Sequence, residues 1–511
     1  MVVKCRSFGL YGIDSYPVEV EASVTAGMPA FDIVGLPDTA VKESRDRVRS
    51  AVKNCGFEFP AARITVNLAP ADIKKEGPIY DLPILISILK ASGQVNADFS
   101  PYAFVGELSL SGELRAVNGI LPMVIKARER GVKGVFVPFE NGSEGAVVDG
   151  IEVYPVKSVF DLIRHFTDRN FSISPAKPAQ EQNSYTPDTA DFSQVRGQYE
   201  AKRAMEIAAA GSHNVLLIGP PGSGKSMLAK RMPSILPDMT FEEKIETTKI
   251  HSIAGVLEKN SPLVSHRPFR APHHNISSAG MTGGGAFPKP GEISLAHNGV
   301  LFLDELPEFS RTTMEALRQP IEDGKVTISR AKISLSYPCS FMLIAAMNPC
   351  PCGYYNHPTR RCSCSQNMIS KYLNKVSGPI LDRFDIHIEV PPVEYDDLSS
   401  AQPEESSAEI KKRVDKAREI QRLRFKDTGI TCNARIDASM FHKVCEVSPE
   451  ANTLLKDAFE NLGLSARAYD RILKVARTIA DLDNSLMIKS DHIAEAIQYR
   501  SLDRKYWDRV E

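Results

Sequence analysis

The feature that most constrains the fold of this chain is a glycine-rich run of eight residues. It comprises Gly219, Pro220, Pro221, Gly222, Ser223, Gly224, Lys225 and Ser226. The run matches the phosphate-binding pattern G-x-x-x-x-G-K-[ST], and it lies between a strand-like run, Asn214–Ile218, and a helical pattern, Lys225–Met232. Such glycines let backbone N–H groups close around phosphates, to which the new helix presents its positive N-terminus. This context disfavours a chance glycine-rich turn, so we expect Lys225 to reach the β- and γ-phosphates of a nucleotide and Ser226 to coordinate Mg²⁺.

Polar residues end two apolar runs further along the chain. Asp304 and Glu305 follow Val300–Leu303, and Asn348 follows Ser340–Met347. Charges are costly inside a sheet, so we expect these residues at the carboxyl ends of the strands, where ligands bind in open α/β sheets. Asp304 suits a magnesium shell, Glu305 suits a base that orients an attacking water, and Asn348 suits holding that water. The pattern predicts hydrolysis; taken alone, the acid pair could also be an ordinary exposed strand end.

Changes in composition divide the 511 residues into three domains and a linker. The linker, residues 172–191, is rich in Pro, Gln, Ser and Thr and has too few apolar residues to offset its ordering entropy. Residues 1–171 alternate strand-like and helical runs, which predicts an α/β or α+β domain. Residues 192–395 alternate short aliphatic strands with helices, which is typical of a parallel sheet covered on both faces. Residues 396–511 begin in an acidic, Ser-rich stretch and continue with helical periodicity.

The same patterns predict individual elements. Strands of the first domain are expected at Ile64–Leu68, Ala103–Leu110 and Val135–Pro138. Its helices are expected at Asp38–Cys55, Leu82–Ser92 and Pro122–Glu129, and those of the last domain at Tyr469–Leu482 and Asp491–Tyr499.

The overall composition excludes several classes of protein. Apolar residues make up 42% of the chain and charged residues 24%, as in ordinary soluble domains. No stretch approaches the roughly 18 apolar residues that span a bilayer, and no apolar region follows the first basic residues as in a signal peptide. We therefore exclude the membrane and secreted classes and expect a cytoplasmic protein. The formal net charge of −1 excludes a uniformly basic nucleic-acid coat, so any DNA contact must come from local basic features or from one such feature repeated around an oligomer.

Four of the nine cysteines lie close together in the sequence, at Cys350, Cys352, Cys362 and Cys364. In a cytosolic chain such a cluster indicates metal binding before it indicates disulfides. Four thiolates complete a tetrahedral Zn²⁺ shell, and His357 could replace one of them. Reduced or redox-active thiols remain the alternative.

A basic hairpin is predicted between the last two strands of the central domain. Apolar residues alternate on both sides of Ser329–Lys332, which places Arg330 and Lys332 at the tip. An ordinary solvated turn is the alternative. The preceding insert, Arg267–Pro290, carries Arg270, a pair of histidines and three consecutive glycines, which suits a mobile loop. Arg270 is a further candidate for a DNA contact.

Three further segments carry a resemblance to a known family. They are Val195–Gln198 before the phosphate loop, Arg267–His274, and Gly291–Gly299 before the acidic strand. With the motifs above, they resemble the ComM/YifB family of magnesium-chelatase-like AAA+ ATPases, over residues from about 10 to 505.

The resemblance implies roles for four residues, two of which are arginines that spacing alone does not select. Gln198 belongs to the segment on the adenine side, Asn348 is the sensor-1 residue and Arg467 is the sensor-2 arginine. Arg383 is the arginine finger that reaches the γ-phosphate held by a neighbouring subunit. An arginine supplied by a neighbouring subunit implies a ring, most simply a homohexamer. The role agrees with phosphoryl-transfer chemistry, in which positive charge stabilises the transferring phosphoryl group.

The resemblance also implies the fold: an AAA+ P-loop parallel-sheet core, an N-terminal α+β domain similar to Lon protease and ribosomal protein S5, and a C-terminal helical lid. Lys75–Pro78 and Gly106–Gly119 carry the Lon-like motifs. Lon-type proteolysis needs a serine activated by a lysine. Ile79 stands at the serine position and Leu121 at the lysine position, so we expect no peptidase activity.

By the same resemblance, the expected activity is ATP-driven translocation on single-stranded and branched DNA, with helicase and branch-migration activity during natural transformation. The basic hairpin becomes the presensor-1 hairpin, and six copies would surround a threaded strand with Arg330 and Lys332. Two alternatives are a chelatase-like chaperone that remodels a protein partner and an ATP-dependent protease, the latter disfavoured by Ile79 and Leu121.

Overall fold

The polypeptide passes between two structural units three times. The computed structural model describes residues 2–178, 190–258, 262–285, 288–330, 333–393, 404–502 and 506–507. Unit 1 contains the described residues of Met1–Tyr185 and of Lys244–Val264, and unit 2 contains those of Thr186–Glu243 and Ser265–Glu511. A segment from the middle of the chain thus belongs to the N-terminal unit, which the sequence patterns did not indicate. The domain boundaries expected at residues 171, 191 and 395 stay predictions.

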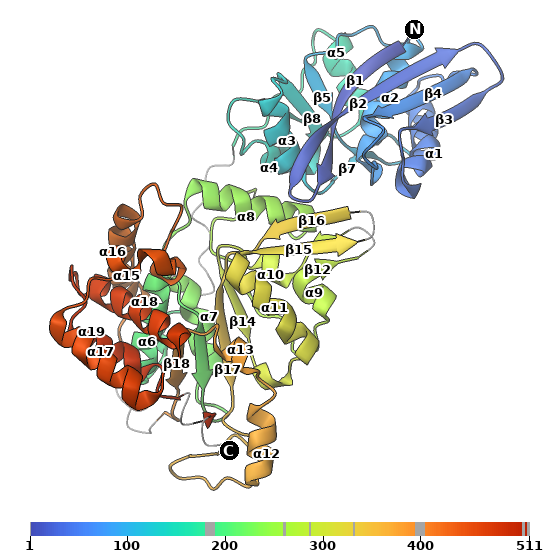
Figure 1. The fold of residues 1–511 in the computed structure, drawn as a ribbon. Helices are drawn as coiled ribbons and strands as arrows, with labels where there is room; N and C mark the ends of the chain where they lie inside the picture. Colours follow the sequence, from blue (N-terminus) through green and yellow to red (C-terminus); the bar gives the residue numbers. More distant parts are fainter. Residues whose placement is uncertain are drawn as a thin grey trace. The chain divides into compact units, whose positions relative to one another are not determined.

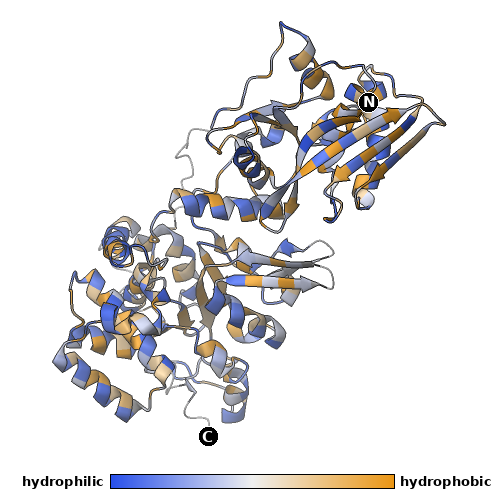
Figure 2. Cartoon of the chain, turned by 45° about the horizontal axis from the view of Figure 1, so that its top comes forward, coloured by the Kyte–Doolittle hydropathy of each residue, from blue (hydrophilic) through white to orange (hydrophobic). Residues whose placement is uncertain are grey.

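Unit 1 is built on a mixed seven-stranded sheet of order β3-β4-β2-β1-β5-β8-β9 (Figure 1). Its strands are β1 (Val2–Tyr11), β2 (Asp14–Thr25), β3 (Ala30–Val34), β4 (Arg63–Ala69), β5 (Tyr102–Phe104), β8 (Gly134–Pro138) and β9 (Glu152–Val156). The antiparallel β1–β2 pair runs the full length of β1, and buried and exposed residues alternate along it, as in a sheet with one face on a core. Figure 2 shows this alternation as bands of hydrophobic and hydrophilic colour on the long strands.

Helices cover this sheet and complete the core of unit 1. They are α1 (Thr39–Asn54), α2 (Asp81–Ala91), α3 (Ile120–Glu129), α4 (Gly142–Gly145) and α5 (Val159–Thr167). α2 and α3 pack against β1 and β2, and nine of the eleven residues of α2 are buried. The Asp38 side chain accepts a hydrogen bond from the Val41 N–H at 2.7 Å and caps α1. The expected helices of this domain are therefore confirmed to within two residues at each end.

One expected strand of unit 1 was wrong. Ala103–Leu110 is interrupted after β5, and a short strand β6 (Glu107–Leu108) instead pairs with β7 (Leu114–Arg115) in a separate two-stranded sheet. The interruption has a physical cause, because the Gly106 N–H donates to the Ile79 carbonyl at 2.9 Å and its carbonyl accepts from Leu82 at 3.1 Å. Tertiary hydrogen bonds thus override a continuous apolar pattern.

Unit 2 contains a fully parallel five-stranded sheet of order β11-β14-β17-β10-β18. The strands are β10 (Val215–Ile218), β11 (Phe269–Arg270), β14 (Val300–Leu303), β17 (Met342–Met347) and β18 (Ile386–Glu389). Every residue of β10, β14 and β17 is buried, as expected for a sheet with helices on both faces. The strand order places the carboxyl ends of β14, β17 and β10 side by side.

Helices of unit 2 surround this sheet (Figure 1). Those before the sheet's last strand are α6 (Tyr199–Gly211), α7 (Lys225–Arg231), α9 (Ser278–Thr282), α10 (Glu292–Leu295), α11 (Arg311–Asp323), α12 (Gln366–Leu373) and α13 (Gly378–Leu381). Those after it are α15 (Ser407–Arg424), α16 (Phe441–Val444), α17 (Pro449–Leu462), α18 (Ala466–Leu482) and α19 (Ser490–Gln498). α18 packs against α6, α15 and α19, so the predicted C-terminal helical region shares one hydrophobic core with the parallel sheet.

Two short antiparallel pairs of strands lie in the segments that connect the strands of the parallel sheet. One is β12 (Gly283–Gly284) with β13 (Lys289–Pro290), and the other is the hairpin β15 (Lys325–Arg330) with β16 (Ile333–Pro338). The hairpin confirms the predicted strand pairing, with Lys325 opposite Pro338 at its base and Arg330 opposite Ile333 beside its tip. Through the described parts of the chain, no helix is both long enough and apolar enough to cross a membrane.

Candidate nucleotide-hydrolysis site

The phosphate loop joins β10 to α7 and depends on its glycines. A Cβ at Gly219 would lie 2.2 Å from the Val390 carbonyl oxygen, so no other residue fits there without movement. Gly222 and Gly224 adopt left-handed φ angles of 77° and 88°. The Gln198 side-chain amide donates to the Ser223 carbonyl, which ties the segment before α6 to the loop. Its glycines are therefore needed for close packing at Gly219 and for left-handed backbone at Gly222 and Gly224.

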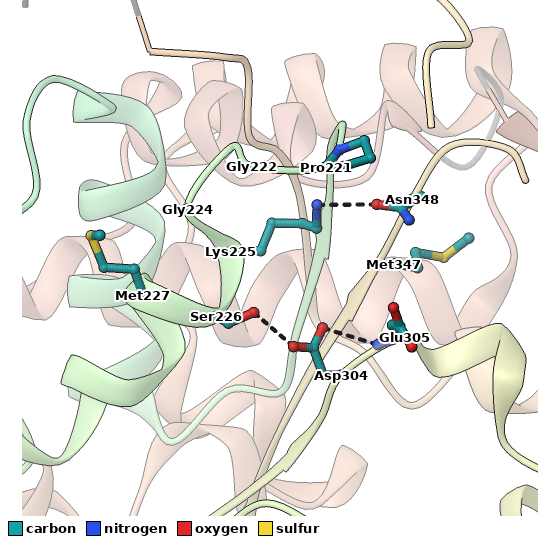
Figure 3. Close-up of a pocket in the computed structure, with 10 residues that line it drawn as sticks. All are labelled: Pro221, Gly222, Gly224, Lys225, Ser226, Met227, Asp304, Glu305, Met347 and Asn348. Atoms are coloured by element: carbon teal, nitrogen blue, oxygen red, sulfur yellow. Dashed lines mark hydrogen bonds between the residues drawn. The ribbon is translucent and has the colours of Figure 1, made fainter. Parts of the chain in front are cut away.

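Lys225 is buried at the start of α7 and points back into the loop (Figure 3). Its ammonium donates to the carbonyl oxygens of Gly219 at 2.7 Å and Pro220 at 2.8 Å, and to Asn348 Oδ1 at 3.3 Å. Burial lowers the pKa of Lys225 to about 8, with partial compensation by the Asp304 carboxylate. The lysine and Asn348 thus already meet at the end of β17.

The two carboxylates after β14 differ in environment. Asp304 Oδ2 accepts a hydrogen bond from the Ser226 hydroxyl at 2.7 Å, and its Oδ1 accepts from the Glu305 N–H at 3.0 Å. The Glu305 backbone has a left-handed φ of 53°, and its side chain is 57% exposed. His274 Nδ1 lies 3.4 Å from Glu305 Oε2. Sequence patterns did not predict this histidine contact, because a lone His pair carries no specific signal.

These side chains line a pocket of about 390 Å³ at the carboxyl ends of the parallel strands. Figure 3 shows the phosphate loop on one side and the strand-end residues on the other. The lining residues are Pro221, Gly222, Gly224, Lys225, Ser226, Met227, Asp304, Glu305, Met347 and Asn348. Met227 and Met347 are apolar members that the motifs did not identify.

The residues present fit a nucleotide and its magnesium. A Cβ at Gly222 would meet nothing within 4 Å, so there is open space beside the loop's backbone. The hydroxyl of Ser226 and the carboxylate of Asp304, 2.7 Å apart, are the hard oxygen donors that Mg²⁺ takes. Lys225 supplies the cation that phosphates require.

The predicted arginines lie outside the lining of this pocket. Arg383 is only 9% exposed; it donates to the Pro379 carbonyl at 2.8 Å and forms an ion pair with Glu322. Arg467 is 65% exposed and donates to Asp382 Oδ2 at 3.1 Å. Each arginine is therefore held by partners within the protomer.

Of the three residues predicted to contact DNA, the structure describes Arg270 and the backbone of Arg330. Arg270 donates to both carboxylate oxygens of Glu292 at 2.7 Å, so its charge is balanced locally. Arg330 ends β15, whereas Lys332 lies outside the described residues.

The four clustered cysteines come together in space. Their Sγ atoms lie within 4.8 Å of one another, and three of the separations are 3.4, 3.5 and 3.7 Å. A zinc ion with four sulfurs at about 2.3 Å has sulfur–sulfur edges of about 3.8 Å, so the thiols fit a tetrahedral shell. His357 is not part of the cluster, and its Nδ1 accepts from the Arg360 N–H at 3.0 Å.

The two positions that a Lon-type protease would use are both apolar and buried in the core of unit 1. Ile79 is the first of these, and Leu121 is the second. Neither side chain can attack a carbonyl or accept a proton. The expectation of no peptidase activity stays a prediction.

The parallel sheet, the phosphate loop and the acidic strand end define a P-loop ATPase core with an added mixed-sheet unit. Comparison with protein families agrees. Residues 191–398 match the family model for magnesium chelatase, subunit ChlI; residues 20–141 match that for subunit ChlI of Mg-chelatase; and residues 404–500 match that for the ChlI C-terminal region.

Individual relatives extend this result over nearly the whole chain. The chain is 46% identical over 495 residues to YifB of Escherichia coli, and 44% identical over 497 residues to the competence protein ComM of Haemophilus influenzae, with 96% of each chain covered. It is also 26% identical over 178 residues to Lon protease 2 of Bacillus subtilis, which covers 31% of this chain and 32% of the relative. The chain belongs to the ComM/YifB family of magnesium-chelatase-like proteins.

Proposed function

We propose that this ATPase assembles as a homohexameric ring and uses ATP hydrolysis to move single-stranded and branched DNA, as a helicase and branch-migration motor. The observation that carries the hydrolytic part is the meeting of Lys225, Ser226, Asp304 and Asn348 around one pocket. The name of the Haemophilus relative, competence protein, supports a role in recombination of incoming DNA during natural transformation.

In this proposal each pocket residue has one task. Ser226 and Asp304 would hold Mg²⁺, which when bound neutralises charge on the phosphates. Lys225 binds the β- and γ-phosphates, and its loss of water on burial strengthens that attraction. Glu305 accepts the proton of the attacking water, for which its exposed carboxylate leaves room. Asn348 orients that water.

The ring is needed to complete the site. Arg383, in our proposal, leaves Glu322 and stabilises the phosphoryl charge in a neighbouring subunit, while Arg467 leaves Asp382 and binds the phosphates of its own subunit. Exchange of one carboxylate partner for a phosphate is reasonable because guanidinium forms similar paired hydrogen bonds with both. Gln198 contacts the adenine side.

The DNA contact is assigned to the β15–β16 hairpin. The sequence places Arg330 at the end of β15 and Lys332 just before β16, and a ring would repeat both cations around the pore of an almost neutral chain. Arg270 adds a further contact if DNA displaces Glu292 from it. Backbone phosphates are the target, so the binding should depend steeply on salt and little on sequence.

We also propose that Cys350, Cys352, Cys362 and Cys364 hold one Zn²⁺. The support is the close spacing of the four sulfur atoms. Metal bound there would fix the segment after β17.

The decisive experiment measures ATPase rate with and without forked DNA for the wild type and for an Arg330→Ala/Lys332→Ala double variant. We expect DNA to stimulate the wild type and not the double variant. Lys325→Ala, at the base of the same hairpin, is the matched control and should keep the stimulation. A wild-type rate that is indifferent to DNA, with branched substrates left unchanged, would reject the DNA motor.

That negative outcome would favour a second function, a chelatase-like chaperone that remodels a protein partner. Its support is the match of the core to a magnesium chelatase subunit. It predicts an ATPase that responds to a protein and not to DNA.

A further inference from the structure

The cysteine cluster lies directly beside the phosphate loop. Gly353, which follows the second cysteine, has a left-handed φ of 82°, and a Cβ at this position would lie 2.3 Å from Cδ of Pro221. The backbone of Gly353 therefore lies against the ring of Pro221 in the phosphate loop, and any side chain at position 353 would collide with that ring. This contact joins two sites that the motifs treat as separate.

A second connection runs through Asn348. This residue precedes Cys350 by two positions, and its side chain accepts from Lys225 at 3.3 Å. The cysteine segment thus begins two residues after an asparagine that lines the nucleotide pocket and contacts its lysine.

The backbone between the first two cysteines forms a tight turn, which the Gly353 N–H closes by donating to the Cys350 carbonyl at 2.9 Å. The sulfur atoms of Cys350 and Cys352 lie 3.4 Å apart, and the Cys362 sulfur lies 3.7 and 3.5 Å from them. One metal ion can therefore join the two ends of the cysteine segment.

From these contacts we infer that Zn²⁺ in the four-cysteine site is coupled to nucleotide binding: the metal fixes the Cys350–Cys364 segment, and that segment holds Pro221 and Asn348 in the positions that bind phosphates. The inference rests on the zinc and nucleotide sites of the proposed function and adds the energetic link between them. Without metal, nothing joins the four thiols to one another, so the Cys350–Cys364 segment is free to move. The phosphate loop then loses its packing contact with that segment. Because coupling free energies are reciprocal, nucleotide must also tighten the hold on zinc by the same factor.

The experiment uses the full-length protein, purified under reducing conditions, with zinc and iron measured by mass spectrometry. Affinity for a fluorescent, slowly hydrolysed ATP analogue is then compared in metal-loaded protein, in chelator-treated protein and after zinc is added back. We expect one zinc per chain, a loss of affinity of about tenfold on removal, within the usual range for coupled sites, and recovery on addition. In a second assay, the analogue should slow zinc release to a coloured chelator.

Variants separate the link from the sites. Cys362→Ser should lose zinc and bind nucleotide weakly, whereas Cys55→Ser, a half-buried cysteine of unit 1 outside the cluster, should behave as the wild type. Chelation of wild-type protein gives the same comparison if Cys362→Ser does not fold.

Each remaining outcome has a distinct meaning. Zinc bound with nucleotide affinity and zinc release both unaffected would overturn the coupling. Iron in place of zinc, or no metal in reduced protein, would overturn the site. Metal-loaded protein that binds one zinc but no nucleotide would instead overturn the proposed ATPase function.

Discussion

The Ser252 hydroxyl donates a hydrogen bond of 2.5 Å to the buried carboxylate of Glu144, although the two residues are 108 positions apart. The Ser252 oxygen also accepts from the Gly119 N–H at 2.9 Å, and Glu144 accepts from the Leu121 N–H at 2.9 Å. Burial raises the pKa of Glu144, while these hydrogen bonds oppose that shift. Through these hydrogen bonds Ser252 attaches its helix to unit 1, although this helix follows the phosphate-loop helix in the sequence.

Replacing Ser252 by alanine should destabilise unit 1. It removes a donor from a buried carboxylate and an acceptor from the Gly119 N–H, and unsatisfied buried polar groups cost about 1–3 kcal/mol each. We expect a lower urea midpoint for the unfolding of this unit, measured by hydrogen exchange of α3 and α8 (Phe241–Ala254). Ser111→Ala, at an exposed position of the same unit, is the control. Equal protection in both variants would contradict the importance of this network.

Much of the site could be predicted from the sequence because its information is local. The phosphate loop, the acids after β14 and the asparagine after β17 each follow a short apolar strand, and parallel strands bring their carboxyl ends to one edge. The buried strand Val300–Leu303 has the predicted bounds, and the helix after the loop differs by one residue.

What could not be predicted depends on contacts between distant residues. No local pattern in α8 indicates that Ser252 meets Glu144, and none in Arg267–His274 indicates that His274 meets Glu305. The long β1–β2 pair was not predicted, although buried and exposed residues alternate along β1 and Gly12 adopts a left-handed φ of 63° in the turn between the two strands. Gly106 shows the converse, since its tertiary hydrogen bonds end a strand that its neighbours favour.

Nucleotide affinity should fall as the pH rises from 7 to 9. In the nucleotide-free protein, the pKa of Lys225 is lowered to about 8 by burial, so above this pH the lysine is increasingly neutral. Phosphates bind the charged form, and binding above pH 8 must therefore take up a proton, with affinity approaching a tenfold loss per pH unit. Fluorescent nucleotide titrations test the trend, and calorimetry in two buffers of different ionisation enthalpy tests the proton uptake.

The matched variant for this pH dependence is Lys225→Arg. A guanidinium keeps its charge throughout this range, so whatever affinity the variant retains should be flat between pH 7 and 9. Equal wild-type affinities at pH 7 and pH 9 would show that Lys225 stays charged in the empty site.

Glu305→Gln should bind ATP normally and hydrolyse it slowly. Glutamine keeps the size of the side chain but cannot accept a proton, and loss of a general base typically reduces rate by about 10²–10⁴-fold. Phosphate release and nucleotide binding should be measured on the same preparation. Glu308 lies three residues after Glu305, and its exposed carboxylate forms an ion pair with Lys375. The control variant Glu308→Gln should therefore retain the wild-type rate. A normal rate for Glu305→Gln would remove Glu305 from its assigned role.

Two inactive variants should restore activity when mixed, if Arg383 acts on a neighbouring subunit. The Lys225→Ala variant has a defective nucleotide site but keeps Arg383. The Arg383→Ala variant has an intact nucleotide site but lacks the arginine. In other phosphoryl-transfer enzymes, the corresponding arginine raises the rate by about 10³–10⁵-fold. In a randomly mixed head-to-tail ring of equal parts, about a quarter of the interfaces combine an intact site with an intact arginine. The ATPase rate should therefore rise to about a quarter of the wild-type value after subunit exchange.

A mixture of Lys225→Ala with Glu305→Gln is the matched control. Both changes affect the same nucleotide site, so no interface between the two variants has both residues intact. If the first mixture stays inactive although the two variants assemble together, Arg383 serves its own protomer through Glu322 and the Pro379 carbonyl, as the single chain holds it.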